Sequence, residues 1–169
     1  MNTRILVAGI GNIFLGDDAF GVKAAQALAR RPLPEGVAVH DFGIRCLDLA
    51  FMLLDDWDHA VLLDAAARGG EPGCLYRIDL DDAPHPETED IQPHSTTVEQ
   101  VRGLARRMAA QVPGKLPRMI LVGCEPASLE PTGGELSPPV ADALPSAVAM
   151  IEALIHELNP ASPLEVTAA

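Results

Sequence analysis

Residues 4–18 read RILVAGIGNIFLGDD and predict the start of an α/β fold. Arg4–Gly9 is an apolar run, which is typical of a strand buried on both faces of a parallel sheet. A turn with three glycines follows it. Asp17 or Asp18 then stands where it can cap a helix that runs to about Arg31. A buried strand, a glycine turn and a helix in this order form the first half of a β-α-β unit.

Strands and helices alternate along the rest of the chain. We expect further strands over Val37–Phe42, Ala60–Leu63, Gly73–Leu80 and Met119–Gly123. The spacing of Leu47, Ala50, Phe51 and Leu54 predicts a second helix, and a capping box of Thr96 and Glu99 starts a third helix that runs to about Gln111. A last helix is expected from Ser137 to about Leu158, with a kink or restart at Pro145. The strand at Gly73–Leu80 is expected at an edge, because Tyr76, Arg77 and Asp79 interrupt its apolar pattern.

This order of elements predicts a three-layer α/β/α sandwich around a mainly parallel, five-stranded, twisted sheet. We expect a single domain over residues 1–158, followed by a flexible tail over residues 159–169. The chain is long enough to bury a core of its own, so we also expect a monomer.

The composition excludes several classes of protein. The 169 residues are 48% hydrophobic, which excludes a wholly disordered chain. The 24 acidic and 12 basic residues give a net charge of -12, the wrong sign for a general nucleic-acid binder or for an anionic membrane surface. Cys46, Cys74 and Cys124 are too widely spaced for a zinc knuckle or a disulfide framework, and Asn12 and Asp17 interrupt any signal-peptide pattern. We therefore expect a cytoplasmic location.

Polar side chains follow the predicted strands at the edge of the sheet where ligands bind in this class of fold. They are Asp17 and Asp18 after the first strand, Asp41 at the end of the second, Asp64 at the end of the third, His94 after the fourth and Glu125 after the fifth. Carboxylates and one imidazole are thus expected to converge at this edge. Such side chains are ligands for divalent ions such as zinc, nickel and manganese.

Each of these residues also has a simpler interpretation. An acid at a helix start complements the helix dipole, but one acid is enough for that, and Asp17 and Asp18 must point in different directions. An ionised Asp64 at the end of a buried strand needs a partner or a metal, unless it caps the next loop. His94, taken alone, fits an exposed loop histidine.

Two other kinds of chemistry are disfavoured. The Gly9-x-Gly11 pair suggests a dinucleotide site, but Phe14 replaces the third glycine of that motif, and the two following acids would repel a pyrophosphate. No G-x-S-x-G motif for a serine nucleophile is present. Cys124 is the only thiol that we keep as a candidate.

Several stretches together resemble one family. Gly9–Val22 resembles the N-terminal signature of the nickel-iron hydrogenase maturation endopeptidases. The likeness continues in Leu62–Ala66, Pro93–Ser95, Leu121–Pro131 and Leu136–Pro138, and its order and spacing extend over about residues 4–155. The resemblance implies a cytoplasmic protease that removes a short C-terminal extension from a hydrogenase large subunit after nickel insertion, with that nickel as the recognition mark.

The resemblance also implies a site. The metal-contacting positions of the family fall on Asp18, Asp64 and His94, and Asp41 is our candidate for assisting proton transfer. Family members commonly carry Glu at the first position, so Asp18 is one methylene shorter. Many members have an Asp-Gly-Gly-Thr-like stretch where this chain has Asp41-Phe-Gly-Ile44, which bears on the hydrogenase class that is served. Arg45 is a candidate for docking the substrate.

The expected partner is a nickel-loaded precursor of a hydrogenase large subunit. The nickel would arrive with the substrate, and we expect no tightly bound metal in the protein itself. The protein would act as an aspartic-type or metal-dependent peptidase. Two alternatives stay open. One is a non-catalytic, nickel-sensing chaperone module for the immature subunit, and the other is a nucleotide-binding domain, which the acids disfavour.

Overall fold

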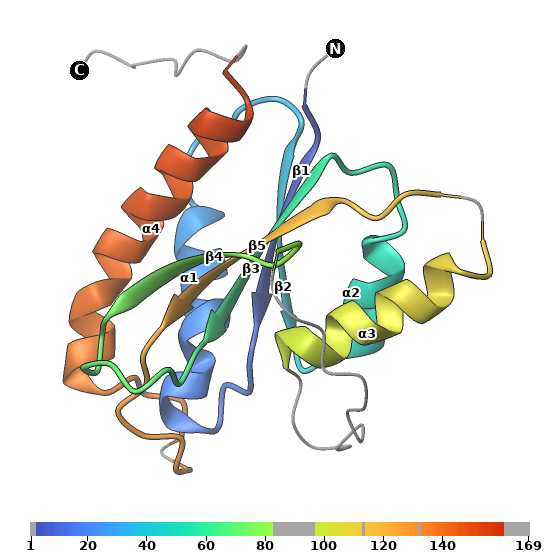
Figure 1. Ribbon diagram of the computed structural model, residues 1–169. Helices are drawn as coiled ribbons and strands as arrows, with labels where there is room; N and C mark the ends of the chain where they lie inside the picture. Colours follow the sequence, from blue (N-terminus) through green and yellow to red (C-terminus); the bar gives the residue numbers. More distant parts are fainter. Residues whose placement is uncertain (1–2, 83–96, 113, 132, 161–169) are drawn as a thin grey trace.

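The computed structural model of the chain (Figure 1) describes residues 3–82, 97–112, 114–131 and 133–160. Its five strands form one sheet in the order β2-β1-β3-β5-β4. The strands are β1 (Ile5–Ile10), β2 (Val37–Gly43), β3 (His59–Ala65), β4 (Leu75–Asp79) and β5 (Arg118–Cys124). Four of them are parallel, and β4 pairs with β5 in the antiparallel direction at the edge. The mainly parallel sheet and the edge strand are therefore confirmed.

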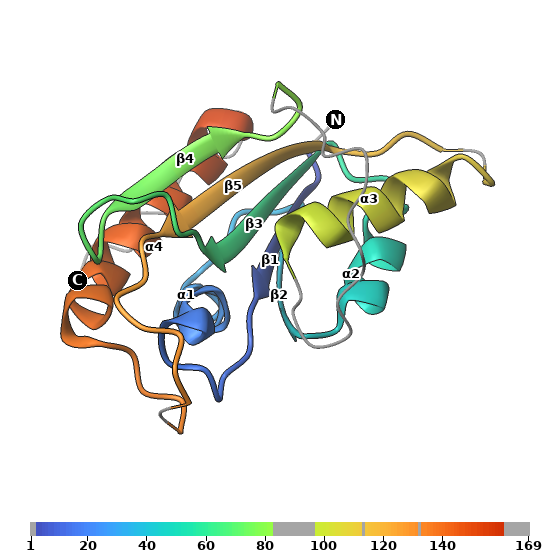
Figure 2. The same ribbon diagram turned by 60° about the horizontal axis from the view of Figure 1, so that its bottom comes forward.

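Helices cover both faces of this sheet. They are α1 (Phe20–Leu28), α2 (Cys46–Met52), α3 (Val98–Ala109) and α4 (Pro138–Leu158). Helices α1 and α4 pack on one face, and α2 and α3 pack on the other (Figures 1 and 2). Two apolar cores fill the spaces between the layers, one with Phe20 and Ile151 and the other with Leu53 and Val101. The predicted three-layer α/β/α sandwich is confirmed.

Three helix predictions differ from the structure. Neither Asp17 nor Asp18 caps α1: the chain first forms a 3₁₀ turn, η1 (Gly16–Ala19), and no side chain caps either element. The capping box of α3 is Thr97 with Gln100, one residue later than predicted. Helix α4 continues through Pro145 as one helix, without a restart.

The buried face of α2 also differs from the prediction. Leu49, Ala50 and Leu53 are buried, whereas Leu47 and Phe51 point to solvent. The helix is apolar on more than one side, so the spacing of its apolar residues fits two faces equally well. Packing against α3 and the sheet selects one of them.

Two glycines bring the turn after β1 close to the sheet. A Cβ on Gly21 would collide with the carbonyl oxygens of Ile10 and Leu63, so α1 lies directly on the backbones of β1 and β3. Gly11 has a φ of 135°, and a Cβ there would collide with the carbonyl oxygen of Asp18. These close approaches place η1, and with it Asp18, beside the end of β3.

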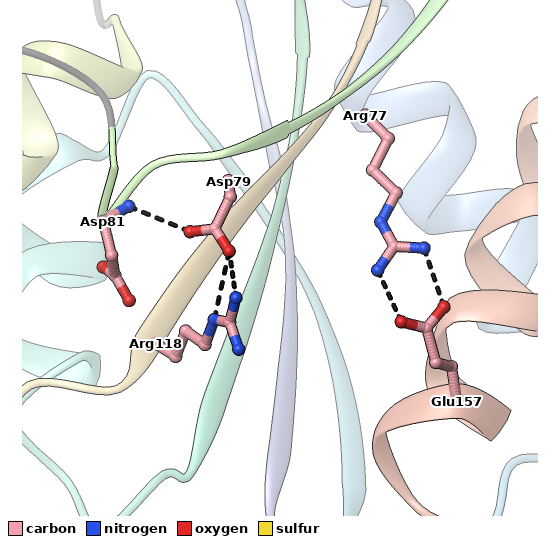
Figure 3. A network of polar contacts seen from close by, with 5 residues as sticks. All are labelled: Arg77, Asp79, Asp81, Arg118 and Glu157. Atoms are coloured by element: carbon pink, nitrogen blue, oxygen red, sulfur yellow. Dashed lines mark hydrogen bonds and ion pairs between the residues drawn. The ribbon is translucent and has the colours of Figure 1, made fainter.

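Ion pairs hold the edge strand in place (Figure 3). Arg77 of β4 donates two hydrogen bonds of 2.7 Å to the carboxylate of Glu157 on α4. On the neighbouring strand Arg118 pairs with Asp79, which also accepts a hydrogen bond of 3.1 Å from the backbone N–H of Asp81. The charges that interrupt the apolar pattern of β4 thus connect this edge strand to α4 and to β5.

Helix α4 is long and apolar enough to cross a membrane by length and composition alone. In the fold, however, it lies along the sheet beside α1 (Figure 1). Val148, Ile151 and Leu154 are buried in the core there. The predicted tail starts at Asn159, which is itself buried and donates a hydrogen bond of 3.3 Å to the carbonyl of Glu35. Residues 161–169 lie outside the described residues.

Candidate active site

A pocket of about 460 Å³ opens at the carboxyl edge of the sheet. It lies between the ends of β1 and β3. From β1 the chain continues to β2 on one side of the sheet, and from β3 the sheet continues to β5 on the other side, and ligands usually bind at such a switch point. Four segments line it: the turn after β1, the end of β3, the start of α3 and the loop after β5. The side chains of Asp18 and Asp64 both belong to its wall. Two of the three predicted metal-contacting residues are therefore brought together.

Asp64 is the more buried of the two carboxylates. It stands near the end of β3 with 7% of its surface exposed. Burial raises the pKa of Asp64 well above its ordinary value, and the negative charge of Asp18 raises it further. The backbone N–H of Ala65 opposes this shift without cancelling it. An ionised Asp64 is therefore costly, and a proton or a cation would relieve that cost.

Asp18 is half-buried at the end of η1. Its Oδ2 atom accepts a hydrogen bond of 2.6 Å from the backbone N–H of Asn12. Burial raises the pKa of Asp18, and this hydrogen bond only partly offsets the rise. Two like-charged groups with raised pKa values thus share one pocket, an arrangement that is common at catalytic and cation-binding sites.

The neighbouring acid, Asp17, points away from the pocket. Its buried carboxylate accepts hydrogen bonds from the N–H of Ala127 at 2.8 Å and that of Ser128 at 3.0 Å. It also accepts from the N–H of Ser137 at 2.7 Å and from its hydroxyl at 2.8 Å. Burial raises the pKa of Asp17, but these hydrogen bonds together lower it below its ordinary value. The sequence predicts different directions for the two acids, but it does not reveal that Asp17 anchors the loop after β5.

Glu125 anchors a second wall of the pocket. Its buried carboxylate accepts hydrogen bonds from the N–H of Arg68 at 2.7 Å, the N–H of Gly69 at 3.2 Å and the hydroxyl of Tyr76 at 2.7 Å. The hydrogen bond to Glu125 raises the pKa of Tyr76 to about 12. Glu125 therefore holds the loop that follows Asp64. In the sequence, only the position of Glu125 after the fifth strand indicates that its side chain lies near the site.

The other predicted residues lie elsewhere. Asp41 lines an adjoining pocket of about 370 Å³ that shares only Asn12 with the first, and its carboxylate accepts a hydrogen bond of 3.0 Å from Gln26. His94 lies outside the described residues. Cys124 is buried in the apolar core, which raises its pKa to about 11 and keeps the thiol protonated and inaccessible. Cys124 is therefore disfavoured as a nucleophile.

Within the described ranges, no three acidic, histidine or cysteine side chains are gathered closely enough to hold a metal ion. Asp18 and Asp64 are two carboxylates in one pocket, and the described residues add no third such side chain to them. The charge of Asp18 raises the cost of ionising Asp64, so the two carboxylates favour sharing a proton in the absence of a cation.

Comparison with known proteins points to one family. The model of the hydrogenase maturation protease family matches residues 22–154. The hydrogenase expression/formation protein HupD of Bradyrhizobium diazoefficiens is 37% identical over 144 residues, which are 83% of this chain and 72% of that protein. The hydrogenase 2 maturation protease of Escherichia coli is 35% identical over 156 residues, 91% and 92% of the two chains. The solved structure of the E. coli hydrogenase maturating endopeptidase HybD superimposes with a TM-score of 0.74 at 33% identity, covering 92% of this chain and 93% of its own.

Proposed function

The chain belongs to the hydrogenase maturation protease family and is an endopeptidase, and we propose that it acts on the precursor of a nickel-iron hydrogenase large subunit. In this proposal it removes a C-terminal extension after nickel has been inserted. The nickel belongs to the substrate and marks a precursor that is ready to be cut.

The observation that carries this proposal is the pair of carboxylates in one pocket. Burial raises the pKa of both Asp18 and Asp64, and the negative charge of Asp18 raises that of Asp64 further. A divalent cation entering the pocket would remove that repulsion and bind both carboxylates, with His94 as a nitrogen ligand. A precursor that carries nickel brings such a cation, whereas a metal-free precursor does not.

The pocket also suits the hydrolysis of a peptide bond. A water molecule adds to the carbonyl carbon of the scissile bond and gives up a proton to a carboxylate. The proton passes to the leaving nitrogen as the carbon–nitrogen bond breaks, which yields a new carboxyl terminus and an amine. Asp64 suits this proton transfer because it lies in the wall of the pocket, where one of its carboxylate oxygens can accept the proton while the other binds the cation. Asp41 remains the second candidate, from the adjoining pocket.

Mass spectrometry of the products tests the proposal against the chaperone alternative. Nickel-loaded precursor is incubated with the protein, and the mass of the large subunit is followed with time. We expect hydrolysis of one peptide bond and release of the extension. Stable binding of an uncut precursor would instead support a non-catalytic, nickel-sensing chaperone.

Substitutions of His94 and Asp41 are expected to differ in severity. His94→Ala removes a nitrogen ligand, so it should weaken binding of the nickel-loaded precursor and slow processing by more than about tenfold. Loss of a residue that only supports a metal ligand already lowers activity by about this factor, and His94 is expected to be a ligand itself. Asp41→Asn should have a smaller effect, because Asp41 lies outside the pocket and already accepts a hydrogen bond from Gln26. Single-turnover cleavage rates compare them. An Asp41→Asn protein as inactive as one lacking Asp64 would assign the proton transfer to Asp41.

Removal of metal ions is expected to leave the fold intact. The two apolar cores hold the sheet and helices together without a metal, and the carboxylate and imidazole ligands include no thiolate. Circular dichroism spectra with and without a strong chelator should therefore superimpose. Loss of the signal on chelation would reveal a structural metal.

A further inference from the structure

Exposed apolar side chains gather beside the pocket rather than over the whole surface. The described residues have seven large apolar side chains that are exposed, and five of them lie on the turn after β1, just after β2 or on α2. These five, which we call the apolar face, are Ile13, Phe14, Ile44, Leu47 and Phe51. Phe14 is 65% exposed, Leu47 53% and Phe51 57%. Exposed apolar side chains that gather in one region are a feature of binding surfaces.

The apolar face adjoins the catalytic pocket. Ile13, Phe14 and Ile44 line the 370 Å³ pocket that shares Asn12 with it. The parallel pairing of β1 and β2 brings the two segments to the same edge of the sheet. Leu47 and Phe51 are four residues apart on α2, so they extend the surface along one side of that helix. A chain bound across Asp18 and Asp64 can thus continue over Asn12 onto this face.

The charged groups at this face are already used within the protein. The Nε of Arg45 donates a hydrogen bond of 3.1 Å to the carbonyl of Phe42, and its guanidinium also donates to the carbonyl of Asp41. Arg45 pairs with Asp48 at 3.8 Å as well. Asp41 accepts from Gln26. Arg45 therefore stabilises its own loop, and its exposed charge lies beside that of Asp48.

We propose that the apolar face binds apolar side chains of the precursor in the extended segment next to the scissile bond. This docking rests on the proposed function, because the occupant is the same polypeptide that is cut in the adjoining pocket. The contacts lie away from the reacting atoms, so they contribute to binding the substrate and leave the chemical step unchanged.

Serine substitutions at two positions test the docking. Phe14→Ser and Phe51→Ser should each raise KM for the nickel-loaded precursor by about tenfold with kcat unchanged, because a buried aromatic anchor is lost from the complex. Phe14→Leu should keep a KM near that of the wild type, since it keeps an apolar side chain. Val112→Ser is the matched control: Val112 is 45% exposed but lies between α3 and the amino end of β5, away from the face, and its KM should not change.

Binding is measured separately from cleavage, in the Asp64→Asn background. The affinity for uncut precursor should fall with Phe14→Ser and Phe51→Ser and stay constant with Val112→Ser. Normal cleavage with unchanged KM and affinity in the Phe variants would overturn the docking and leave the proposed function standing. Weakened binding by the Phe variants when the wild type cuts nothing would support the docking and overturn the proposed cleavage. A wild-type dimer that Phe51→Ser converts to a monomer would identify the face as a self-association surface instead.

Discussion

Replacing Asp64 with Asn is expected to abolish processing of the precursor while the protein stays folded. Asn is nearly isosteric with Asp, so the packing at the end of β3 survives. The substitution removes the negative charge that would bind the cation and the base that would accept a proton from water. Mass spectrometry of nickel-loaded precursor should show no release of the extension over times at which the wild type has finished.

The same substitution should leave the protein at least as stable at neutral pH. The pKa of Asp64 is raised in the folded protein, so above the unfolded value of 3.8 its ionisation opposes folding, and Asn removes that cost. A thermal unfolding scan checks this, with Asp142→Asn, on an exposed stretch of α4, as the control. An Asp64→Asn protein that is folded and cuts at the wild-type rate would show that Asp64 is not part of the catalytic site.

Replacing Asp17 with Asn is expected to have the largest effect on stability. The buried carboxylate accepts four hydrogen bonds from the loop after β5, and an Asn amide would turn N–H groups toward some of those donors. We expect the free energy of unfolding to fall by about 2–4 kcal/mol, because hydrogen bonds to a buried charge are strong and unmade ones are costly. Denaturant titrations measure the change, and Asp142→Asn again serves as the control. Equal midpoints for the wild type and Asp17→Asn would contradict this function of Asp17.

The stability difference between the wild type and Asp17→Asn should also depend on pH. The pKa of Asp17 is lowered in the folded protein, because its hydrogen bonds outweigh the effect of burial. A lowered pKa stabilises the fold above the unfolded value of 3.8, and this contribution is lost as the pH falls through the folded value. The difference should therefore be full at neutral pH and shrink on acidification below about pH 4.

Periodicity in the sequence predicts most of the fold. Runs such as Arg4–Gly9 and Ala60–Leu63 are apolar because both faces of these strands are covered, so strand type and sheet class follow from them. The antiparallel direction of the edge strand β4 and the buried face of α2 are set by contacts between elements that are distant in the sequence. Leu47 and Phe51 fit a helical period, yet they face solvent because Leu49 and Leu53 pack inward.

The candidate site is predictable in part. Asp18 and Asp64 are predictable because Asp18 comes after a buried strand and Asp64 stands near the end of another, and the topology brings these strand ends together. Asp41 lies near the end of β2, but β2 is at the edge of the sheet, and the carboxylate of Asp41 lies in the adjoining pocket. The anchoring by Asp17 and Glu125 was not predicted, because it depends on backbone N–H groups of loops whose course no spacing in the sequence reveals.

Cleavage of precursor with and without nickel tests the central proposal most directly. The site is expected to be incomplete until the substrate supplies its metal, since Asp18, Asp64 and His94 without an ion cannot strongly polarise a carbonyl or a water. Nickel-loaded precursor, metal-free precursor under a strong chelator, and unfolded casein are incubated with the same enzyme and followed by mass spectrometry. We expect cleavage of the nickel-loaded precursor alone. Efficient cleavage of the metal-free precursor under the chelator would contradict a nickel-completed site.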